Sequence, residues 1–128
     1  MSRYLKEKTD SKCIVYVADP LGSGLFDAIN QHLKGETVGV AGDVNGKPIT
    51  WFPRSAGGSV TEGIGVDRKT NNFGTSLEAG FIDGTLQVTD QEAIDVGYHL
   101  LQNDGIFVGP SDLVRKAVGS EPSIPPHI

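Results

Sequence analysis

The segment from Gly57 to Gly65 is the part of this sequence best suited to chemistry. Only Val60 and Ile64 have aliphatic side chains there, so the backbone amides stay open to an anion or a cofactor. The segment is neither the G-x-G-x-x-G of dinucleotide-binding folds nor a Walker loop, because no Gly-Lys-Ser/Thr follows it. A connecting turn and a ligand loop are both compatible with this pattern, and the pattern alone favours the turn.

A second candidate is Gly109-Pro110-Ser111-Asp112, which follows the short apolar run 106–108. We predict that this run is a buried strand. Open α/β sheets place their ligands at the carboxyl ends of strands, so Ser111 is well placed for a polar contact to a ligand. A serine at such a turn can also cap the helix that follows, and the residues alone favour the cap.

Other reaction types find little support in the titratable residues. No Ser/His/Asp order and no paired-carboxylate spacing stands out. The three histidines lie far apart, and the single cysteine excludes an internal disulfide. We therefore predict no metal site. A net charge of −5 argues against nucleic acid as a partner.

The same composition gives expectations about location. No apolar run approaches the length of a membrane span, so we expect no membrane partner. The first residues lack the apolar centre of a secretory signal. These features predict a soluble protein of the cytoplasm, with mitochondria as the alternative.

The elements that must position the two loops alternate between strand and helix. Apolar, β-branched runs at 12–19 and 82–88 are typical of strands covered on both faces. An apolar stripe with i, i+4, i+8 spacing predicts a helix over 25–34, and Asn45-Gly46 predicts a hairpin. Residues 66–80 show no clear period. The alternation indicates an α/β fold.

The later part of the chain has one well-marked element. Thr89 and Glu92 have the spacing of a capping box, which predicts a helix over 90–103. Residues 113–118 have room for two helical turns, but three prolines follow them. We therefore expect 113–128 to be a divergent, disordered tail.

Four segments in this order closely resemble the later half of cysteine synthases, also called O-acetylserine sulfhydrylases. The segments are 17–25, 59–65 with Arg68, 88–93 and 103–109. The E-G-I-G and V-T-D-Q-E-A stretches are especially characteristic. The resemblance covers roughly 2–111. It implies a partial three-layer αβα sheet domain of a fold-type-II pyridoxal phosphate (PLP) enzyme, truncated at both ends.

The resemblance also implies a site. In the family, a loop faces the cofactor ring and binds the small amino-acid substrate, and a serine hydrogen-bonds the pyridine nitrogen. Ser111 stands in the place of that serine, after Gly109 at the end of the short strand. Pro110 and Asp112 depart from the small residues usual in the family. The substrate-binding positions are Glu62, Gly63, Ile64 and Gly65.

The same resemblance assigns no catalytic residue to this sequence. The family's Schiff-base lysine, its Thr-Ser-Gly-Asn loop and its Gly-Thr-Gly-Gly-Thr phosphate cradle all precede the matched region. We expect 1–112 to be part of the cofactor-side large domain, and we expect the chain alone to be inactive. An alternative is a non-catalytic module that forms a homo- or hetero-oligomer with a full-length subunit, and a further one is a gene-model fragment.

Overall fold

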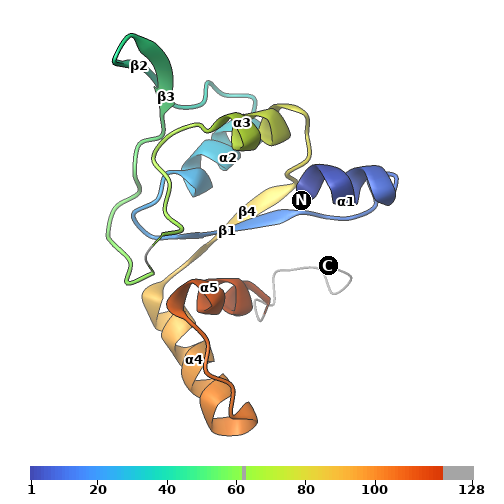
Figure 1. The fold of residues 1–128 in the computed structure, drawn as a ribbon, viewed down its shortest axis with the longest axis vertical. Coiled ribbons are helices and arrows are strands. Elements are labelled where there is room, and N and C mark those ends of the chain that lie inside the picture. Colours follow the sequence, from blue (N-terminus) through green and yellow to red (C-terminus); the bar gives the residue numbers. More distant parts are fainter. Residues whose placement is uncertain (62, 120–128) are drawn as a thin grey trace.

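Two parallel strands form the centre of the molecule. In the computed structural model, which describes residues 1–61 and 63–119, β1 (Tyr16–Pro20) pairs with β4 (Gly84–Val88). Tyr16 lies opposite Gly84, where a Cβ atom would come within 2.6 Å of the Tyr16 ring. Helices cover both faces of the pair (Figure 1).

One face of the sheet packs against α2 (Leu25–Leu33) and α3 (Asn71–Glu78). Their contact with the sheet is an apolar cluster that includes Val17 of β1. Its buried members are Ile29, Leu77 and Ile82. Ile29 comes from the predicted stripe of α2, whose outer member Leu33 is half exposed.

The other face packs against α4 (Asp90–Asp104) and α5 (Pro110–Gly119). Ala18 of β1 packs there, because successive strand residues point to opposite faces. The buried members of this cluster are Val88, Ala93, Val114 and Ala117. A sheet between two helical layers confirms the predicted partial αβα arrangement.

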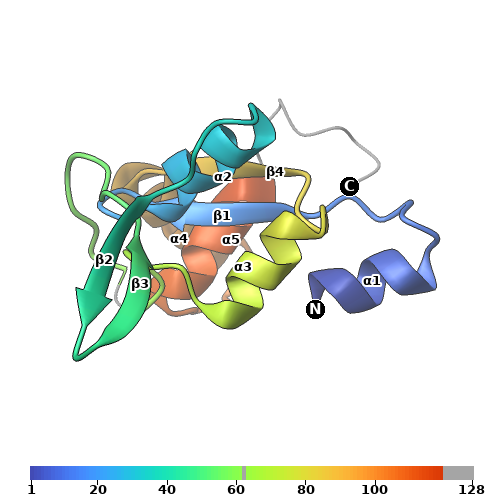
Figure 2. The ribbon, with the colours of Figure 1, turned by 90° about the horizontal axis from the view of Figure 1, so that it is seen from above.

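The predicted hairpin is present. β2 (Val40–Val44) pairs with β3 (Lys47–Trp51) through a two-residue loop. Asn45 and Gly46 both have positive φ, +52° and +77°, which a tight turn between antiparallel strands requires. Figure 2 shows the hairpin at the opposite end of the molecule from α1 (Ser2–Lys8).

The capping box of α4 is also confirmed. The Thr89 hydroxyl accepts from the Glu92 amide, and the Glu92 carboxylate accepts from the Thr89 amide at 2.7 Å. Gly105 ends the helix in the left-handed conformation that glycine adopts without strain.

Two predicted elements differ from the structure, and one helix was not predicted. The run 106–108 pairs with neither β1 nor β4 and is not a strand, and Phe107 is 86% exposed. The first strand begins at Tyr16 and not at residue 12. Helix α3 lies within residues 66–80, where no period was visible. It is capped by Thr70 and anchored by one buried side chain, that of Leu77.

The segment expected to be a disordered tail is partly helical. Leu113 to Gly119 continue α5, and Val114 and Ala117 are buried beneath the sheet. The free energy gained by burying these two side chains offsets the entropy lost when the backbone becomes ordered. The sequence pattern of 113–118 did not predict this burial. The rest of the expected tail, 120–128, lies outside the described residues.

Candidate functional site

The glycine-rich loop lies beyond the carboxyl ends of β1 and β4. β1 ends at Pro20 and leads into the turn at Gly22, while β4 ends at Val88 and leads into α4. In an open α/β sheet this edge is where ligands bind. The predicted loop therefore lies at the edge of the sheet suited to a site.

Asp90 holds the loop from the side of α4. Its Oδ1 accepts from the Ser59 hydroxyl at 2.6 Å, and its Oδ2 accepts from the Val60 amide at 2.9 Å. Asp90 is the first residue of α4, where a carboxylate also interacts favourably with the helix dipole. One side chain thus fixes the loop to the helix.

Ser23 holds the other end of the loop. Its hydroxyl accepts from the Val66 amide at 3.1 Å and donates to the Val66 carbonyl at 3.3 Å. The Gly24 amide donates to the same carbonyl at 2.8 Å. Ser23 is fully buried, so these bonds are shielded from water.

A cavity of about 320 Å³ lies between this loop and the turn after β1. The residues lining it are Pro20, Leu21, Gly22, Arg54, Gly57, Gly58, Ser59, Thr61 and Gly65. Gly22 is required there, because at φ +80° a Cβ would lie 2.9 Å from the Gly57 carbonyl oxygen. Backbone and hydroxyl groups dominate the lining, as the glycine content predicts.

Arg54 is the charged residue of this cavity. Its guanidinium donates to the Gly22 carbonyl at 3.2 Å and to Asp67 Oδ2 at 2.9 Å. The hydrogen bond from Arg54 holds the pKa of Asp67 below its usual range. Sequence reasoning assigned no ligand role to Arg54 or Asp90, because their partners lie far away in the chain.

Asp19 lies buried behind the turn. Its Oδ2 accepts from the Phe26 amide at 2.8 Å, whereas no group among the described residues bonds its Oδ1. Burial raises the pKa of Asp19, although the hydrogen bond from the Phe26 amide at the start of α2 opposes the shift. Asp19 therefore anchors the first turn of α2 beside the cavity.

The predicted cofactor residues lie at the start of α5. The Gly109 carbonyl accepts from the amides of Asp112 and Leu113 at 3.0 and 3.2 Å, so Gly109 takes the capping position. Pro110 follows as the first helical residue, where proline is favoured. Interpreting Ser111 as the cap is therefore wrong. Ser111 is a half-buried residue of the first turn.

The structure describes the surroundings of Gly63 and Ile64 in the predicted substrate loop. Ile64 packs against the cluster that contains Val114, one turn along α5 from Ser111. Gly63 has φ +82° and open space where a Cβ would be, so its backbone is accessible. No described hydrogen bond joins Ser111 to the loop. Glu62 lies outside the described residues.

Known proteins similar to this chain share one name. A protein of Saccharomyces cerevisiae named "Putative mitochondrial cysteine synthase" is 33% identical over 115 residues, which are 90% of this chain and 27% of that protein. Cysteine synthase 2 of Schizosaccharomyces pombe is 37% identical over 115 residues, 90% of this chain and 26% of that protein. The chain belongs to the cysteine synthase family.

The family match extends beyond these fungal proteins. The cysteine synthase of Dictyostelium discoideum is 31% identical over 115 residues, which are 90% of this chain and 27% of that protein. The chain thus spans about a quarter of the length of the cysteine synthases it matches. No family model matches the chain.

Two further properties concern the described part of the chain. No three His, Cys, Asp or Glu residues gather there as ligands for a metal ion. None of the helices described has the length and apolar character needed to cross a membrane.

Proposed function

We propose that this chain supplies the C-terminal, cofactor-facing part of a PLP-dependent cysteine synthase. The reaction of the whole enzyme is a β-replacement, in which O-acetylserine and sulfide give cysteine and acetate. The observation that supports the proposal is the glycine-rich loop at the carboxyl edge of the parallel strands, where Ile64 packs against the cluster of Val88, Ala93, Val114 and Ala117 and Gly65 lines the cavity.

The roles proposed for individual residues follow the family pattern. Gly63 and Gly65 leave backbone groups open toward an amino-acid substrate, and Glu62 completes that loop in the family pattern. Ser111, after Gly109, offers a neutral hydroxyl for the pyridine nitrogen of PLP. When bound, PLP stabilises negative charge at the substrate Cα during elimination and addition.

The residues present fit only one side of that cofactor. The cavity beside the loop is lined by hydroxyls, backbone and Arg54, and no lysine is among its lining residues. Lys6 is engaged with Asp83, and Lys69 with Glu78. Covalent attachment of PLP needs a lysine amine at the site, so this polypeptide alone is proposed to be inactive.

The test uses the 128-residue chain with added PLP. We expect no protein-bound Schiff-base absorption band that borohydride makes permanent, and no cysteine from O-acetylserine and sulfide. A full-length cysteine synthase is the positive control under the same conditions. A stoichiometric borohydride-fixed adduct together with cysteine formation would overturn the proposal.

A second candidate function is pairing with a full-length cysteine synthase subunit. The observation that favours it is an apolar surface on the outer side of α4. Tyr98 is 62% exposed and Phe107 is 86% exposed, beside an apolar groove of about 440 Å³. The groove is lined by Ile94, Gly97, Tyr98, Leu101, Phe107, Val108 and Leu113. Contiguous exposed apolar surface of this kind marks interaction sites.

The pairing candidate has a direct test. Co-purification of the chain with a full-length cysteine synthase would support it, and Phe107→Ser would then weaken the complex. Arg3→Gln, on the exposed face of α1, is the control that leaves the complex intact. A clean monomer in sedimentation, in the presence of the full-length subunit, would exclude this candidate.

A further inference from the structure

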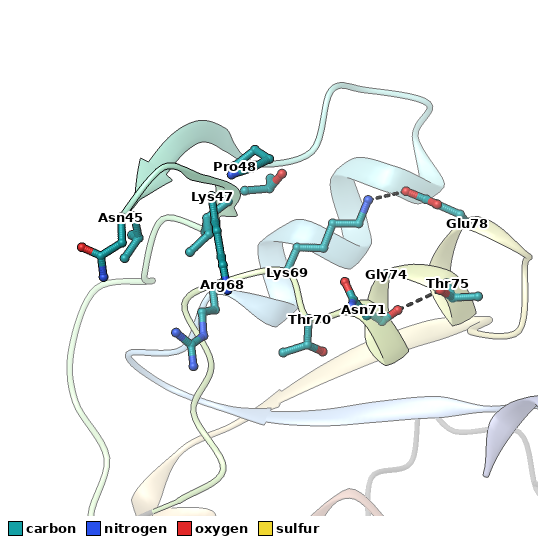
Figure 3. Close-up of a pocket in the computed structure, with 13 residues that line it drawn as sticks. Asn45, Lys47, Pro48, Arg68, Lys69, Thr70, Asn71, Gly74, Thr75 and Glu78 are labelled. Carbon is teal, nitrogen blue, oxygen red and sulfur yellow. Dashed lines mark hydrogen bonds and ion pairs between the residues drawn. The ribbon is translucent and has the colours of Figure 1, made fainter.

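A separate groove lies between the β2–β3 hairpin and α3. It has a volume of about 760 Å³ and shares no lining residue with the cavity at the glycine-rich loop. Its walls carry three cationic side chains and one carboxylate, shown in Figure 3. These charged residues are Lys47, Arg68, Lys69 and Glu78. A locally positive groove is unusual on a chain whose net charge is −5.

Of these three cations, Lys69 has an ion-pair partner. Lys69 Nζ pairs with Glu78 across α3, as Figure 3 shows. Gly74 makes this path possible, because a Cβ there would collide with Lys69 Cε. Lys69 accordingly holds the pKa of Glu78 below its usual range. Among the described residues, neither Lys47 nor Arg68 has an ion-pair partner.

Backbone hydrogen bonds fix the two free cations to one framework. Arg68 forms an isolated antiparallel bridge with Trp51, and the Lys69 amide donates to the Thr50 carbonyl at 2.9 Å. The segment 67–69 therefore lies along β3 as a short extra strand. Lys47 begins that same strand, so regular structure sets the backbone positions of both residues.

Neutral donors surround the charges. Asn45 and Asn71 are among the residues that line the groove, and Thr70 lines it at the start of α3. The first amides of a helix carry partial positive charge that favours anions. The groove volume is within the range of about 300–1,000 Å³ found for small-molecule sites.

We propose that this groove binds the phosphate group of a small phosphorylated molecule. Two unpaired cations, Lys47 and Arg68, match the two negative charges that a phosphate monoester carries near neutral pH. Arg and Lys are the side chains that most often bind phosphate oxygens. A long polyanion fits poorly, because the negative charge of the chain would repel the part that extends beyond the groove.

The test is a titration of the full chain with inorganic phosphate, followed by amide chemical shifts in NMR at constant ionic strength set with NaCl. We expect saturable shifts at Lys47, Arg68 to Asn71 and Thr75. The double variant Lys47→Gln/Arg68→Gln should weaken binding at least fivefold. The matched control, Arg3→Gln/Lys8→Gln, removes the same charge from α1 and should bind as the parent does.

Folding is checked in the same spectra. Signals from β1 and β4 should superimpose between parent and variants, because Lys47 and Arg68 are both exposed. If the double variant does not fold, the two single variants should each weaken binding at least twofold. Three results would overturn the proposal. One is a set of chemical shifts that does not saturate with phosphate, and another is a loss of affinity in the α1 control variant as large as that in the double variant. The third result is tighter binding of a ten-nucleotide single strand than of phosphate. None of these outcomes depends on the PLP test, because the two sites share no residue.

Discussion

Lys6 Nζ lies 2.6 Å from Asp83 Oδ2, and this ion pair joins α1 to the segment that enters β4. The Lys6 side chain is only 7% exposed, whereas that of Asp83 is 33% exposed. The Val15 amide donates to the same carboxylate oxygen at 2.7 Å. One carboxylate therefore organises the entries of both parallel strands, and Lys6 provides its countercharge.

Removal of Lys6 should destabilise the fold. Lys6→Met keeps much of the apolar stem but leaves Asp83 without its cation. We expect a loss of about 1–3 kcal/mol in the free energy of unfolding, less than for a fully buried pair because Asp83 is partly exposed. Urea unfolding at pH 7 measures it. Arg3→Gln, which removes an exposed ion pair on the same helix, should change stability little. Equal effects from both variants would contradict this role for Lys6.

The same pair predicts a dependence on pH. Burial acts to raise the pKa of Asp83, but the bonds from Lys6 and the Val15 amide outweigh it and hold that pKa below its usual value. The stabilisation is therefore present above the pKa of an unfolded aspartate, near 3.9, and is lost as pH falls through the lower folded value. Asp83→Asn should flatten this acid limb of the stability profile, and an unchanged limb would refute the assignment.

Asp19 should behave in the opposite sense. Burial raises its pKa, so stability falls as pH rises from the unfolded pKa to the folded one and then stays lower. Asp19→Asn keeps an acceptor for the Phe26 amide and should remain within about 1 kcal/mol of the parent at pH 7. Asp19→Ala loses that acceptor and should cost about 1–2 kcal/mol. Thermal unfolding between pH 3 and 7 measures the stability of both variants. A greater loss of stability in Asp19→Asn than in Asp19→Ala would contradict the expected role of Asp19 as an acceptor.

Gly22 and Gly58 form a matched pair for the loop. Gly22→Ala places a Cβ against the Gly57 carbonyl at a positive φ and should cost about 2–4 kcal/mol. Gly58→Ala meets open space at an ordinary φ and should stay within about 0.5 kcal/mol. Chemical denaturation of the two variants compares them. Equal losses would show that the close approach at Gly22 does not govern this loop.

Asp90 is expected to control the mobility of the loop. Asp90→Ala removes the acceptors for the Ser59 hydroxyl and the Val60 amide. Hydrogen exchange of the Val60 amide should accelerate about tenfold, which corresponds to about 1.4 kcal/mol of lost protection. Asp104→Ala, at the other end of α4, is the control. If the Val60 amide exchanges at the parental rate, the hydrogen bonds to Asp90 do not hold the loop.

The sequence predicted those elements whose signals lie within a few residues. The capping box at Thr89 and the Asn45-Gly46 turn each need only local hydrogen bonds or local φ angles, so their outcome did not depend on distant partners. The run 106–108 failed for the opposite reason. An apolar run becomes a strand only beside another strand, and the composition of the run does not reveal whether that neighbour exists.

The candidate site shows the same division. The glycine content of 57–65 predicted an open backbone, and the backbone at Gly63 is open. The hydrogen bonds between Ser59 and Asp90 and between Arg54 and Asp67 join residues 13 or more positions apart in the sequence. Neither pair has a spacing that a sequence pattern would reveal. Such contacts emerge only when the parallel strands bring their carboxyl ends together.

The register of β1 against β4 has a consequence for the rate of folding. Val17 pairs with Thr85, 68 residues later in the sequence, so the central sheet must close a long loop of chain before it gains any contact. The hairpin and the α4–α5 pair involve short separations and can form much earlier. The parallel pairing should therefore limit the folding rate, and on the ribosome it has to wait until β4 has emerged.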